Sequence, residues 1–206
     1  MVEVAAILLA AGTSSRFRAA GGEHSTKLAA PLAGKPLVRH AAEAALASLA
    51  RPVVVVTGHD RAVVERALAG LDVRFVDNPG YEQGLSSSLK TGIAALPGNV
   101  AGALILLGDM PAVTPALIDR LIAAFSARPD ALVAAPFVEG RRGNPALLAR
   151  ALFPSVAALA GDEGARKILD GAAPDRTIEV DASGFAAVLD VDTPLSLAEA
   201  RRLLEK

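Results

Sequence analysis

Ile7-Leu8-Leu9-Ala10-Ala11-Gly12-Thr13-Ser14-Ser15-Arg16 is the stretch that decides the fold. An uncharged apolar run over residues 4–10 leads directly into small residues, hydroxyls and one cation. A run without polar alternation is typical of a parallel strand covered on both faces. Small side chains at Ala11 and Gly12 let backbone N–H groups approach an anion, and the Arg16 guanidinium can bind two phosphate oxygens. The stretch predicts a strand and a phosphate-binding loop, although a plain strand-to-helix turn also fits it.

The loop has neither of the two common glycine signatures. The Gly-x-Gly-x-x-Gly spacing of dinucleotide-binding folds is absent, and so is the Gly-Lys-Ser/Thr end of a P-loop. A nucleotide-dependent oxidoreductase is therefore disfavoured. The rest of the chain has to distinguish a functional loop from a simple turn.

Short apolar runs alternate with helical patterns along the whole chain. Strands are predicted at 2–9, 52–57, 73–76, 103–107, 131–135 and 186–191, and helices at about 36–49, 60–69, 85–96, 114–127 and 195–205. This order predicts an α/β fold, a single Rossmann-like domain with a mostly parallel twisted sheet and helices on both faces. Residues 17–35 and 136–180 interrupt the alternation, and we expect lids or binding loops there.

Composition excludes several classes of function. The chain has 206 residues, of which 21 are basic and 22 acidic, so no global field attracts nucleic acid or an anionic membrane. Aromatic residues are only 3% of the chain and cysteine is absent, which disfavours base-stacking platforms and excludes thiolate metal sites. We expect a cytoplasmic protein that binds neither nucleic acid nor a membrane.

Two aspartates follow predicted strands. Asp109 comes after the run 103–107, and Asp192 follows the run 186–191 and precedes Thr193-Pro194. Two carboxylates at neighbouring strand ends can hold one Mg²⁺, whose remaining ligands are water and phosphate oxygens. Each aspartate alone could instead cap a helix or form a turn. Asp190 is expected on the opposite strand face from Asp192, which makes it the weaker ligand candidate.

Motifs in the same order along nearly the whole chain resemble the nucleotidyltransferases of molybdenum-cofactor biosynthesis. They are Leu9-Ala10-Ala11-Gly12-x-Ser14-x-Arg16, Lys27 ahead of Pro31-Leu32-x-Gly34-Lys35-Pro36-Leu37, Gly108-Asp109-Met110-Pro111, Gly140-x-x-Gly143-Asn144-Pro145, Gly161-Asp162-x-Gly164-Ala165-Arg166 and Asp190-x-Asp192-Thr193-Pro194. The chain is most similar to the cytidylyltransferase branch, because Ala11 stands where the guanylyltransferase branch usually has glycine and because the Gly161–Arg166 segment is typical of the cytidylyl branch.

The resemblance implies a nucleotide-diphospho-sugar transferase fold over residues 1–206 and a dependence on magnesium. It implies transfer of CMP from CTP, or of a nucleotidyl group from another NTP, to a molybdopterin-type phosphate acceptor, with release of pyrophosphate. The N-terminal half would bind the nucleotide, and residues of about 136–180 would lie on the acceptor side. A molybdoenzyme or its chaperone is a possible partner. One departure is the long separation between Arg16 and Lys27, which makes the reach of Lys27 an open question.

The candidate site residues follow from these motifs and from the loops at the strand ends. We expect catalysis to depend on Arg16, Lys27 and Asp109, and metal binding on Asp109 and Asp192. The expected nucleotide-binding residues are Leu9, Ala10, Ala11, Gly12, Thr13, Ser14, Ser15, Arg16, Lys27, Thr57, Gly58, Asn78, Gly84, Ser86, Ser87, Ser88 and Gly108. Those expected to bind the acceptor are Arg141, Gly143, Asn144 and Pro145.

Several alternatives stay open at this level. Asn78-Pro79 also reads as a plain turn, Gly84 to Ser88 as ordinary serine capping of a helix, and the loop at 140–145 as a solvated turn. The donor could be GTP, and the acceptor a sugar phosphate or an alditol phosphate. A non-catalytic chaperone for a nucleotide or pterin cofactor would be expected to lack a metal ligand or a loop cation. Arg16, Lys27, Asp109 and Asp192 are all present.

Overall fold

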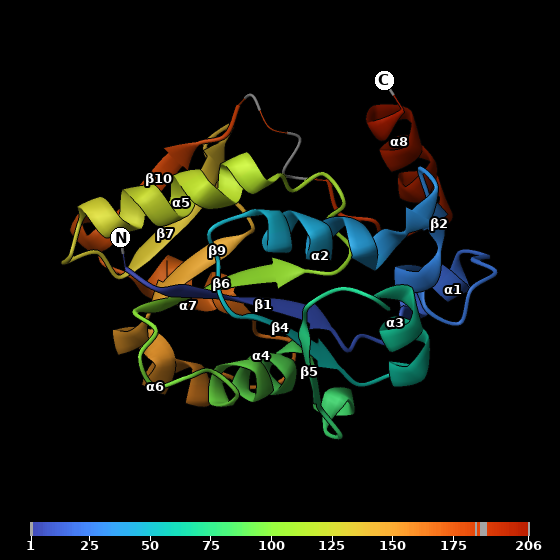
Figure 1. The fold of residues 1–206 in the computed structure, drawn as a ribbon, viewed down its shortest axis with the longest axis horizontal. Helices are drawn as coiled ribbons and strands as arrows, with labels where there is room; N and C mark the ends of the chain where they lie inside the picture. Colours follow the sequence, from blue (N-terminus) through green and yellow to red (C-terminus); the bar gives the residue numbers. More distant parts are fainter. Residues whose placement is uncertain (1, 184, 186–188, 206) are drawn as a thin grey trace.

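The computed structural model describes residues 2–183, 185 and 189–205. Its main sheet has the strand order β10-β7-β9-β6-β1-β4-β5 (Figure 1). Strand β8 pairs with β7. Within this sheet, as far as the described residues show it, β8 and β9 run antiparallel to their neighbours and the other pairs are parallel. The strands are β1 (Val4–Ala10), β4 (Val53–Thr57), β5 (Arg74–Asp77), β6 (Gly102–Leu107), β7 (Val133–Val138), β8 (Arg141–Arg142), β9 (Ala146–Ala149) and β10 (Thr177–Asp181). The expected α/β fold with a mostly parallel sheet is confirmed.

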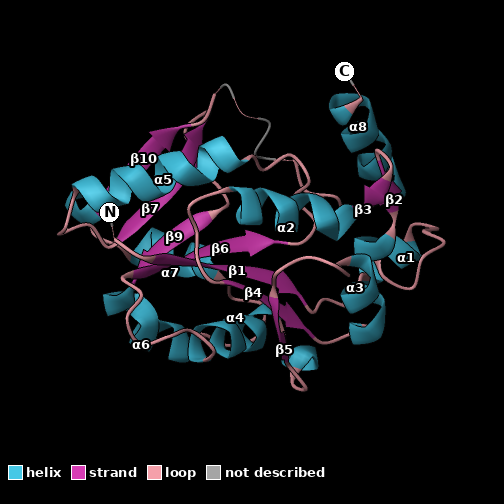
Figure 2. Cartoon of the chain, in the orientation of Figure 1, coloured by secondary structure: helices cyan, strands magenta, loops and turns pink. Residues whose placement is uncertain are grey.

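The apolar run at the start of the chain forms β1, which is buried along its whole length. Side chains on one face of β1, such as Leu8, pack with helices α2 (Leu37–Ala47), α3 (Arg61–Ala67) and α5 (Pro115–Ala127). Side chains on the other face, such as Ile7, pack with α4 (Leu85–Ala94), α6 (Phe153–Ala157) and α7 (Ala165–Gly171). Helices therefore cover both faces of the sheet (Figure 2), which explains why β1 lacks polar alternation.

Residues 136–180, expected to be irregular, contain regular structure instead. They hold β8, β9, β10, α6, α7 and the 3-10 helices η3 (Arg150–Leu152) and η4 (Pro174–Arg176). Strand β9 lies antiparallel between β6 and β7. Its four residues are all buried, and so short a run cannot be distinguished from a buried loop by periodicity.

The last predicted strand, 186–191, is also different. Residues 186–188 lie outside the described residues, and residues 189–191 form no strand. The backbone N–H of Val191 donates to the carbonyl of Asp109 at 3.0 Å, which attaches this segment to the end of β6. Helix α8 (Pro194–Leu204) follows, and its Ala200 packs with Leu32 and Leu37.

Residues 17–35 form short elements rather than one open loop. They contain most of α1 (Ser15–Ala19), then η1 (Lys27–Ala29), β2 (Pro31–Leu32) and the start of β3 (Lys35–Pro36). Strands β2 and β3 make a separate two-stranded sheet. Within the described ranges, no helix combines the length and apolar character that a membrane crossing requires.

The parallel arrangement brings several chain segments to one edge of the sheet. In the register of β1, Leu9 pairs with Leu107 of β6 and Ala10 with Thr57 of β4. The carboxyl ends of these strands therefore meet at the same edge, where open α/β sheets bind ligands.

Candidate active site

A cavity of about 580 Å³ lies at this edge, beyond the ends of β1 and β6. It brings together the N-terminal loop, the start of η1, the region from the 3-10 helix η2 (Tyr81–Gln83) to α4, and three aspartate-bearing loops. The lining residues are Leu9, Ala10, Ala11, Gly12, Thr13, Ser14, Ser15, Arg16, Phe17, Lys27, Leu28, Tyr81, Glu82, Gly84, Leu85, Ser88, Leu107, Gly108, Asp109, Asp162, Asp190 and Asp192. Every predicted residue of the N-terminal loop lines this cavity.

The N-terminal loop turns sharply from β1 into α1. Ser14 adopts a left-handed backbone conformation with φ 56°, and its side chain does not cap the helix. Gly12 is exposed, and a side chain added there would meet nothing within 4 Å. Phe17 is buried and anchors the short helix. The small residues of the loop therefore face the cavity, and Phe17 fixes the end of the loop to the core.

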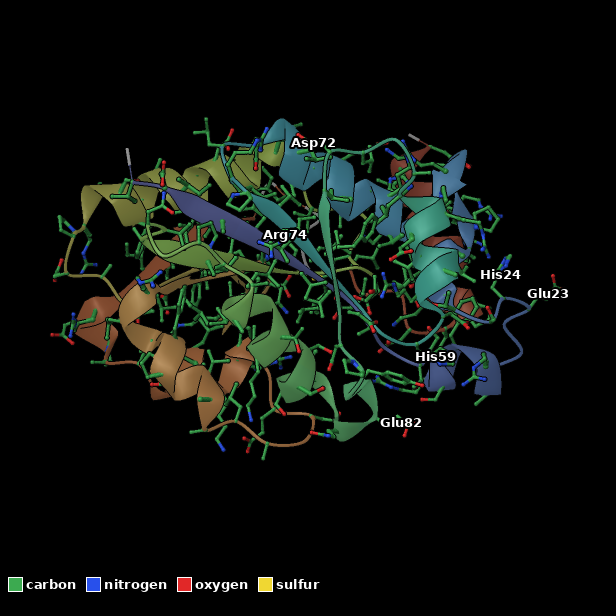
Figure 3. All side chains as sticks on the ribbon, turned by 60° about the horizontal axis from the view of Figure 1, so that its bottom comes forward. Glu23, His24, His59, Asp72, Arg74 and Glu82 are labelled. Carbon is green, nitrogen blue, oxygen red and sulfur yellow. The ribbon has the colours of Figure 1, made fainter. Side chains whose placement is uncertain are left out.

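Lys27 reaches the cavity despite its separation from Arg16. Its backbone N–H donates to Ser14 Oγ at 3.1 Å, and Ser14 Oγ lies 3.2 Å from the hydroxyl of the fully buried Thr26. These hydrogen bonds hold the two ends of the loop formed by residues 17–26 close together. Figure 3 shows Glu23 and His24 on the outward-facing part of this loop.

Lys27 bridges two carboxylates. Its Nζ lies 2.6 Å from Asp109 Oδ2 and 2.7 Å from Asp192 Oδ1, and its side chain is only 13% exposed. Burial acts to lower the pKa of Lys27, but the charges and hydrogen bonds of Asp109 and Asp192 outweigh it, so that pKa is raised. Lys27 is therefore protonated at neutral pH.

Asp192 also binds the loop cation. Arg16 Nη1 lies 2.6 Å from Asp192 Oδ2. Burial alone would raise the pKa of Asp192, but the hydrogen bond and charge of Lys27, together with the charge of Arg16, hold it below its usual value. Two cations and two carboxylates thus form one network across the cavity.

Asp109 and Asp192 fit a divalent cation that keeps other ligands. Asp109 Oδ1 is buried and has no hydrogen-bond partner among the described residues. No cluster of three or more His, Cys, Asp or Glu residues in the described part of the chain forms a protein-only metal cage. Mg²⁺ typically takes one or two carboxylates and completes its coordination with water and phosphate oxygens. The donor set is therefore compatible with a metal bound together with a phosphate ligand.

Asp190 lines the same cavity as Asp192, which corrects the expectation that it points to the opposite face. Strand alternation does not apply, because residues 189–192 form no strand. Burial raises the pKa of Asp190 to about 6, and the negative charges of Asp109 and Asp192 act in the same direction.

Other predicted nucleotide-binding residues lie beside the cavity without lining it. Asn78 is buried: its Nδ2 donates to Ser87 Oγ at 2.9 Å and to Ser88 Oγ at 3.0 Å, while its Oδ1 accepts from Gly80 N–H at 3.1 Å. Thr57 and Ser86 are buried too. Gly84 and Ser88 do line the cavity, as does Gly108.

Gly58 lies where two walls of the site approach one another. A Cβ at this position would lie 2.9 Å from Ala11 Cβ and 2.7 Å from Tyr81 Cβ. Tyr81 in turn lines the cavity, and its ring centroid is 5.8 Å from that of His59. Gly58 therefore permits the contact between the N-terminal loop and η2.

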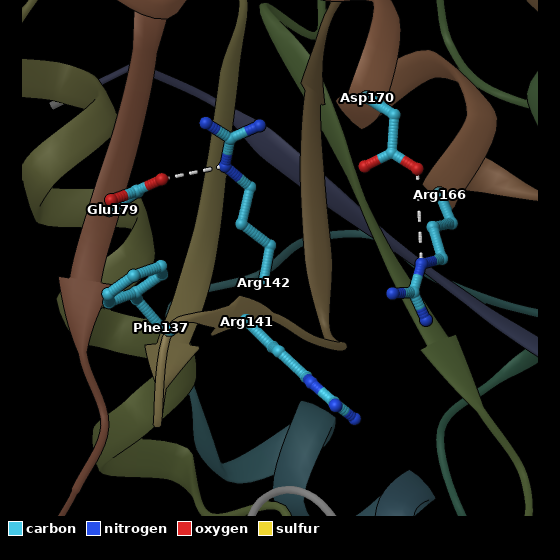
Figure 4. A pocket seen from close by; sticks show the side chains of 7 residues that line it. Phe137, Arg141, Arg142, Arg166, Asp170 and Glu179 are labelled. Carbon is cyan, nitrogen blue, oxygen red and sulfur yellow. Dashed lines mark hydrogen bonds and ion pairs between the residues drawn. The ribbon is translucent and has the colours of Figure 1, made fainter.

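The predicted acceptor residues do not line this cavity. Arg141 lines a separate cavity of about 250 Å³ near β7, α7 and β10 (Figure 4). Gly143, Asn144 and Pro145 line neither of the two cavities. In that second cavity Arg142 is paired with Glu179 at 2.8 Å. Arg166 lines it as well, whereas Asp162 lines the large cavity. The segment between Asp162 and Arg166 thus lies between the two cavities.

Sequence reasoning missed several lining residues, including Tyr81, Glu82, Leu85 and Asp162. The sequence did contain a signal for Tyr81, which is the chain's single tyrosine and follows the turn after β5. Asp162 depends on packing instead: Ser86 N–H donates to Gly161 O at 3.0 Å, and a Cβ at Gly84 would lie 2.7 Å from Asp162 Oδ1.

Comparison with known proteins agrees with this geometry. The family described as the MobA-like NTP transferase domain matches residues 6–179. A curated relative, the bifunctional protein GlmU of Kineococcus radiotolerans, is 36% identical over 137 residues, which are 64% of this chain. The chain spans only 26% of that relative's length.

Solved structures match over the whole fold of this chain. Rv0371c from Mycobacterium tuberculosis H37Rv has a TM-score of 0.81 at 26% identity and covers 100% of this chain and 99% of its own. That protein has also been solved in complex with manganese. A nucleotidyl transferase from Methanothermobacter thermautotroptrophicus has a TM-score of 0.81 at 25% identity, with 98% of each chain covered.

Proposed function

The chain belongs to the MobA-like NTP transferase family, and we propose that it transfers CMP from CTP to the terminal phosphate of molybdopterin with magnesium as cofactor. The observation that carries the reaction type is one cavity in which the loop Leu9–Arg16 and Lys27 face Asp109 and Asp192. Such an arrangement suits a triphosphate that binds together with a divalent cation. Membership of this family supports nucleotidyl transfer as the reaction type, and the nucleotide base, the acceptor and magnesium are the parts that we propose.

The reaction requires positive charge more than it requires a base. A terminal phosphate is already largely ionised at neutral pH, so one of its oxygens can attack the α-phosphorus of the nucleotide directly. A new P–O bond forms there, the bond to the β-phosphate oxygen breaks, and pyrophosphate leaves with the electron pair. Positioning and charge neutralisation dominate the catalysis of phosphoryl transfer, and we extend that account to nucleotidyl transfer.

The chain's own residues supply distinct parts of this chemistry. The open amides around Gly12 and the guanidinium of Arg16 bind triphosphate oxygens. Lys27 stabilises the negative charge that collects on the leaving group. Magnesium held by Asp109 and Asp192 would add further positive charge at the same oxygens.

Cytidine and molybdopterin are proposed from the motifs rather than from the cavity. Ala11 and the segment Gly161–Arg166 match the cytidylyl branch. Because this segment lies between the two cavities, the nucleotide is expected in the large cavity and the acceptor on the side formed by residues 136–180. A molybdoenzyme or its chaperone would then receive the product.

A pyrophosphate-release assay tests this proposal. CTP, GTP, ATP and UTP are each supplied with Mg²⁺, with and without molybdopterin. We expect release only with CTP and molybdopterin together. Equal or faster release with GTP would overturn the choice of donor. Release with a sugar phosphate or alditol phosphate, but not with molybdopterin, would overturn the choice of acceptor.

A further inference from the structure

Lys27 occupies the position between the two carboxylates that a divalent ion would take. Its Nζ contacts Asp109 Oδ2 at 2.6 Å and Asp192 Oδ1 at 2.7 Å, so one ammonium group neutralises both acids. Asp109 Oδ1 stays buried without a hydrogen-bond partner among the described residues. The network therefore holds both acids in place while one ligand oxygen is left unused.

We propose that Lys27 is a resident cation that excludes free divalent metal from Asp109 and Asp192, so that the metal enters only together with the nucleotide. This role rests on the proposed function for the identity of the metal and the nucleotide. Lys27 would then position the two metal-binding carboxylates, in addition to the role toward phosphate that the proposed function gives it.

The charges of the network support this order of binding. Arg16 and Lys27 balance Asp109 and Asp192, so the four groups are neutral together. A free divalent ion would have to displace the Lys27 ammonium, whose side chain is only 13% exposed, from both of its hydrogen-bonded carboxylates, which costs free energy. A triphosphate removes this cost, because its oxygens offer the displaced ammonium new acceptors.

The local structure allows the exchange without a change of the backbone. The Lys27 N–H is fixed to Ser14 Oγ, and the following turn is fixed by Thr26, whose Oγ1 accepts from Leu28 N–H at 3.3 Å. The long, flexible side chain of Lys27 can therefore turn from the acids toward the N-terminal loop, which lines the same cavity. Only side-chain torsions have to change.

Binding of Mn²⁺ to the nucleotide-free protein, measured by the loss of the free-ion electron paramagnetic resonance signal, tests the proposal. The wild-type protein is expected to bind Mn²⁺ weakly. Lys27→Met, which keeps the side-chain length and removes the charge, is expected to bind Mn²⁺ about tenfold more tightly or better, because two carboxylates lose their cation. Lys27→Arg keeps the charge and is expected to stay weak. Lys35→Met, which removes an ammonium paired with Glu43 instead, is the matched control.

Lys27→Gln provides a second uncharged variant should Lys27→Met fail to fold, with circular dichroism as the check on folding. A merely structural role for Lys27 would leave Mn²⁺ affinity unchanged or weaken it in both variants, and either result would overturn the proposal. The assay contains no nucleotide and no acceptor. Its failure would therefore leave the CMP-transfer proposal standing, and a failed transfer assay would leave the Mn²⁺ result interpretable.

Discussion

The backbone N–H of Lys27 donates a hydrogen bond to Ser14 Oγ across 3.1 Å, and this contact joins the phosphate-binding loop to the lysine that faces the aspartates. Although residues 17–26 separate them along the chain, the N-terminal loop and Lys27 line the same cavity. The position of Lys27 in the cavity therefore depends on the hydroxyl of Ser14 more than on the length of the chain between them.

Ser14→Ala is expected to lower kcat for pyrophosphate release by about tenfold to a hundredfold, because a small displacement of a catalytic group is costly. The free energy of unfolding should fall by only about 1 kcal/mol, the usual worth of one hydrogen bond. Steady-state kinetics and urea unfolding measure the two effects. Ser155→Ala, on α6 and away from the cavity, is the control, and wild-type kinetics in Ser14→Ala would contradict the anchoring role.

Asp109→Ala is expected to abolish pyrophosphate release while the protein stays folded. Lys27 keeps Asp192 as a partner at 2.7 Å, so no buried charge is left alone, and the free energy of unfolding should change by only about 1 to 3 kcal/mol, the worth of one hydrogen bond to a charged group. Asp130→Ala removes an exposed aspartate elsewhere and serves as the control. Normal turnover by Asp109→Ala would exclude this residue from the metal site.

Arg16→Ala is expected to raise KM for the nucleotide by about tenfold, since a hydrogen bond from a charged donor is lost. Its side chain is 80% exposed, so stability should not change measurably. Arg18→Ala removes a neighbouring arginine of α1 that does not line the cavity. The same KM in both variants would show that Arg16 does not bind the nucleotide.

Gly84→Ala is expected to destabilise the fold by about 2 kcal/mol or more, as overpacking does. Gly84 has φ +94°, and a Cβ there would lie 2.5 Å from Gly161 O. Gly70→Ala measures the cost of a positive φ without crowding, because Gly70 has φ +79° and nothing near its Cβ, and it should cost about 1 kcal/mol. Urea unfolding compares the two, and equal losses would show that the Gly84 to Gly161 contact is loosely packed.

His40 is expected to make the protein less stable in acid. Burial lowers the pKa of His40, and the positive charge of Lys35 lowers it further. The hydrogen bond to the Leu32 carbonyl and the negative charge of Glu43 act to raise this pKa but do not outweigh the burial. The unfolded chain therefore binds more protons than the folded chain below about pH 6.5, and the free energy of unfolding falls there. Urea unfolding at about pH 7.5 and about pH 5.5 should show a smaller loss in His40→Gln than in the wild type. Equal losses would contradict this prediction.

Much of the fold could be predicted because its signals are local. Strand β1 is a continuous apolar run, and the helices that cover it show clear periodicity, so the α/β alternation is evident from the sequence. Strand β9 could not be predicted: it is four residues long, and its pairing with β6 and β7 is a long-range choice. The segment 189–192 could not be predicted either, because a hydrogen bond to Asp109 holds it in place rather than a strand ladder.

The site shows the same division. Some of its groups could be predicted from residue types next to apolar runs, namely the small residues around Gly12, the guanidinium of Arg16 and the carboxylates of Asp109 and Asp192. Other features could not be predicted, because they depend on contacts between distant segments. They are the bridge from Lys27 to both carboxylates, the hydrogen bond of Asn78 to Ser87 and the position of Asp162 at the cavity.

The sequence by itself determined which elements form and which chemical groups stand at their ends, since short-range periodicity and residue type encode both. Only the tertiary structure decided which of those groups meet. Lys27, Asp109 and Asp192 are far apart along the chain, and they converge because parallel strands bring their carboxyl ends to one edge and because Ser14 and Val191 fix the two loops that carry Lys27 and Asp192.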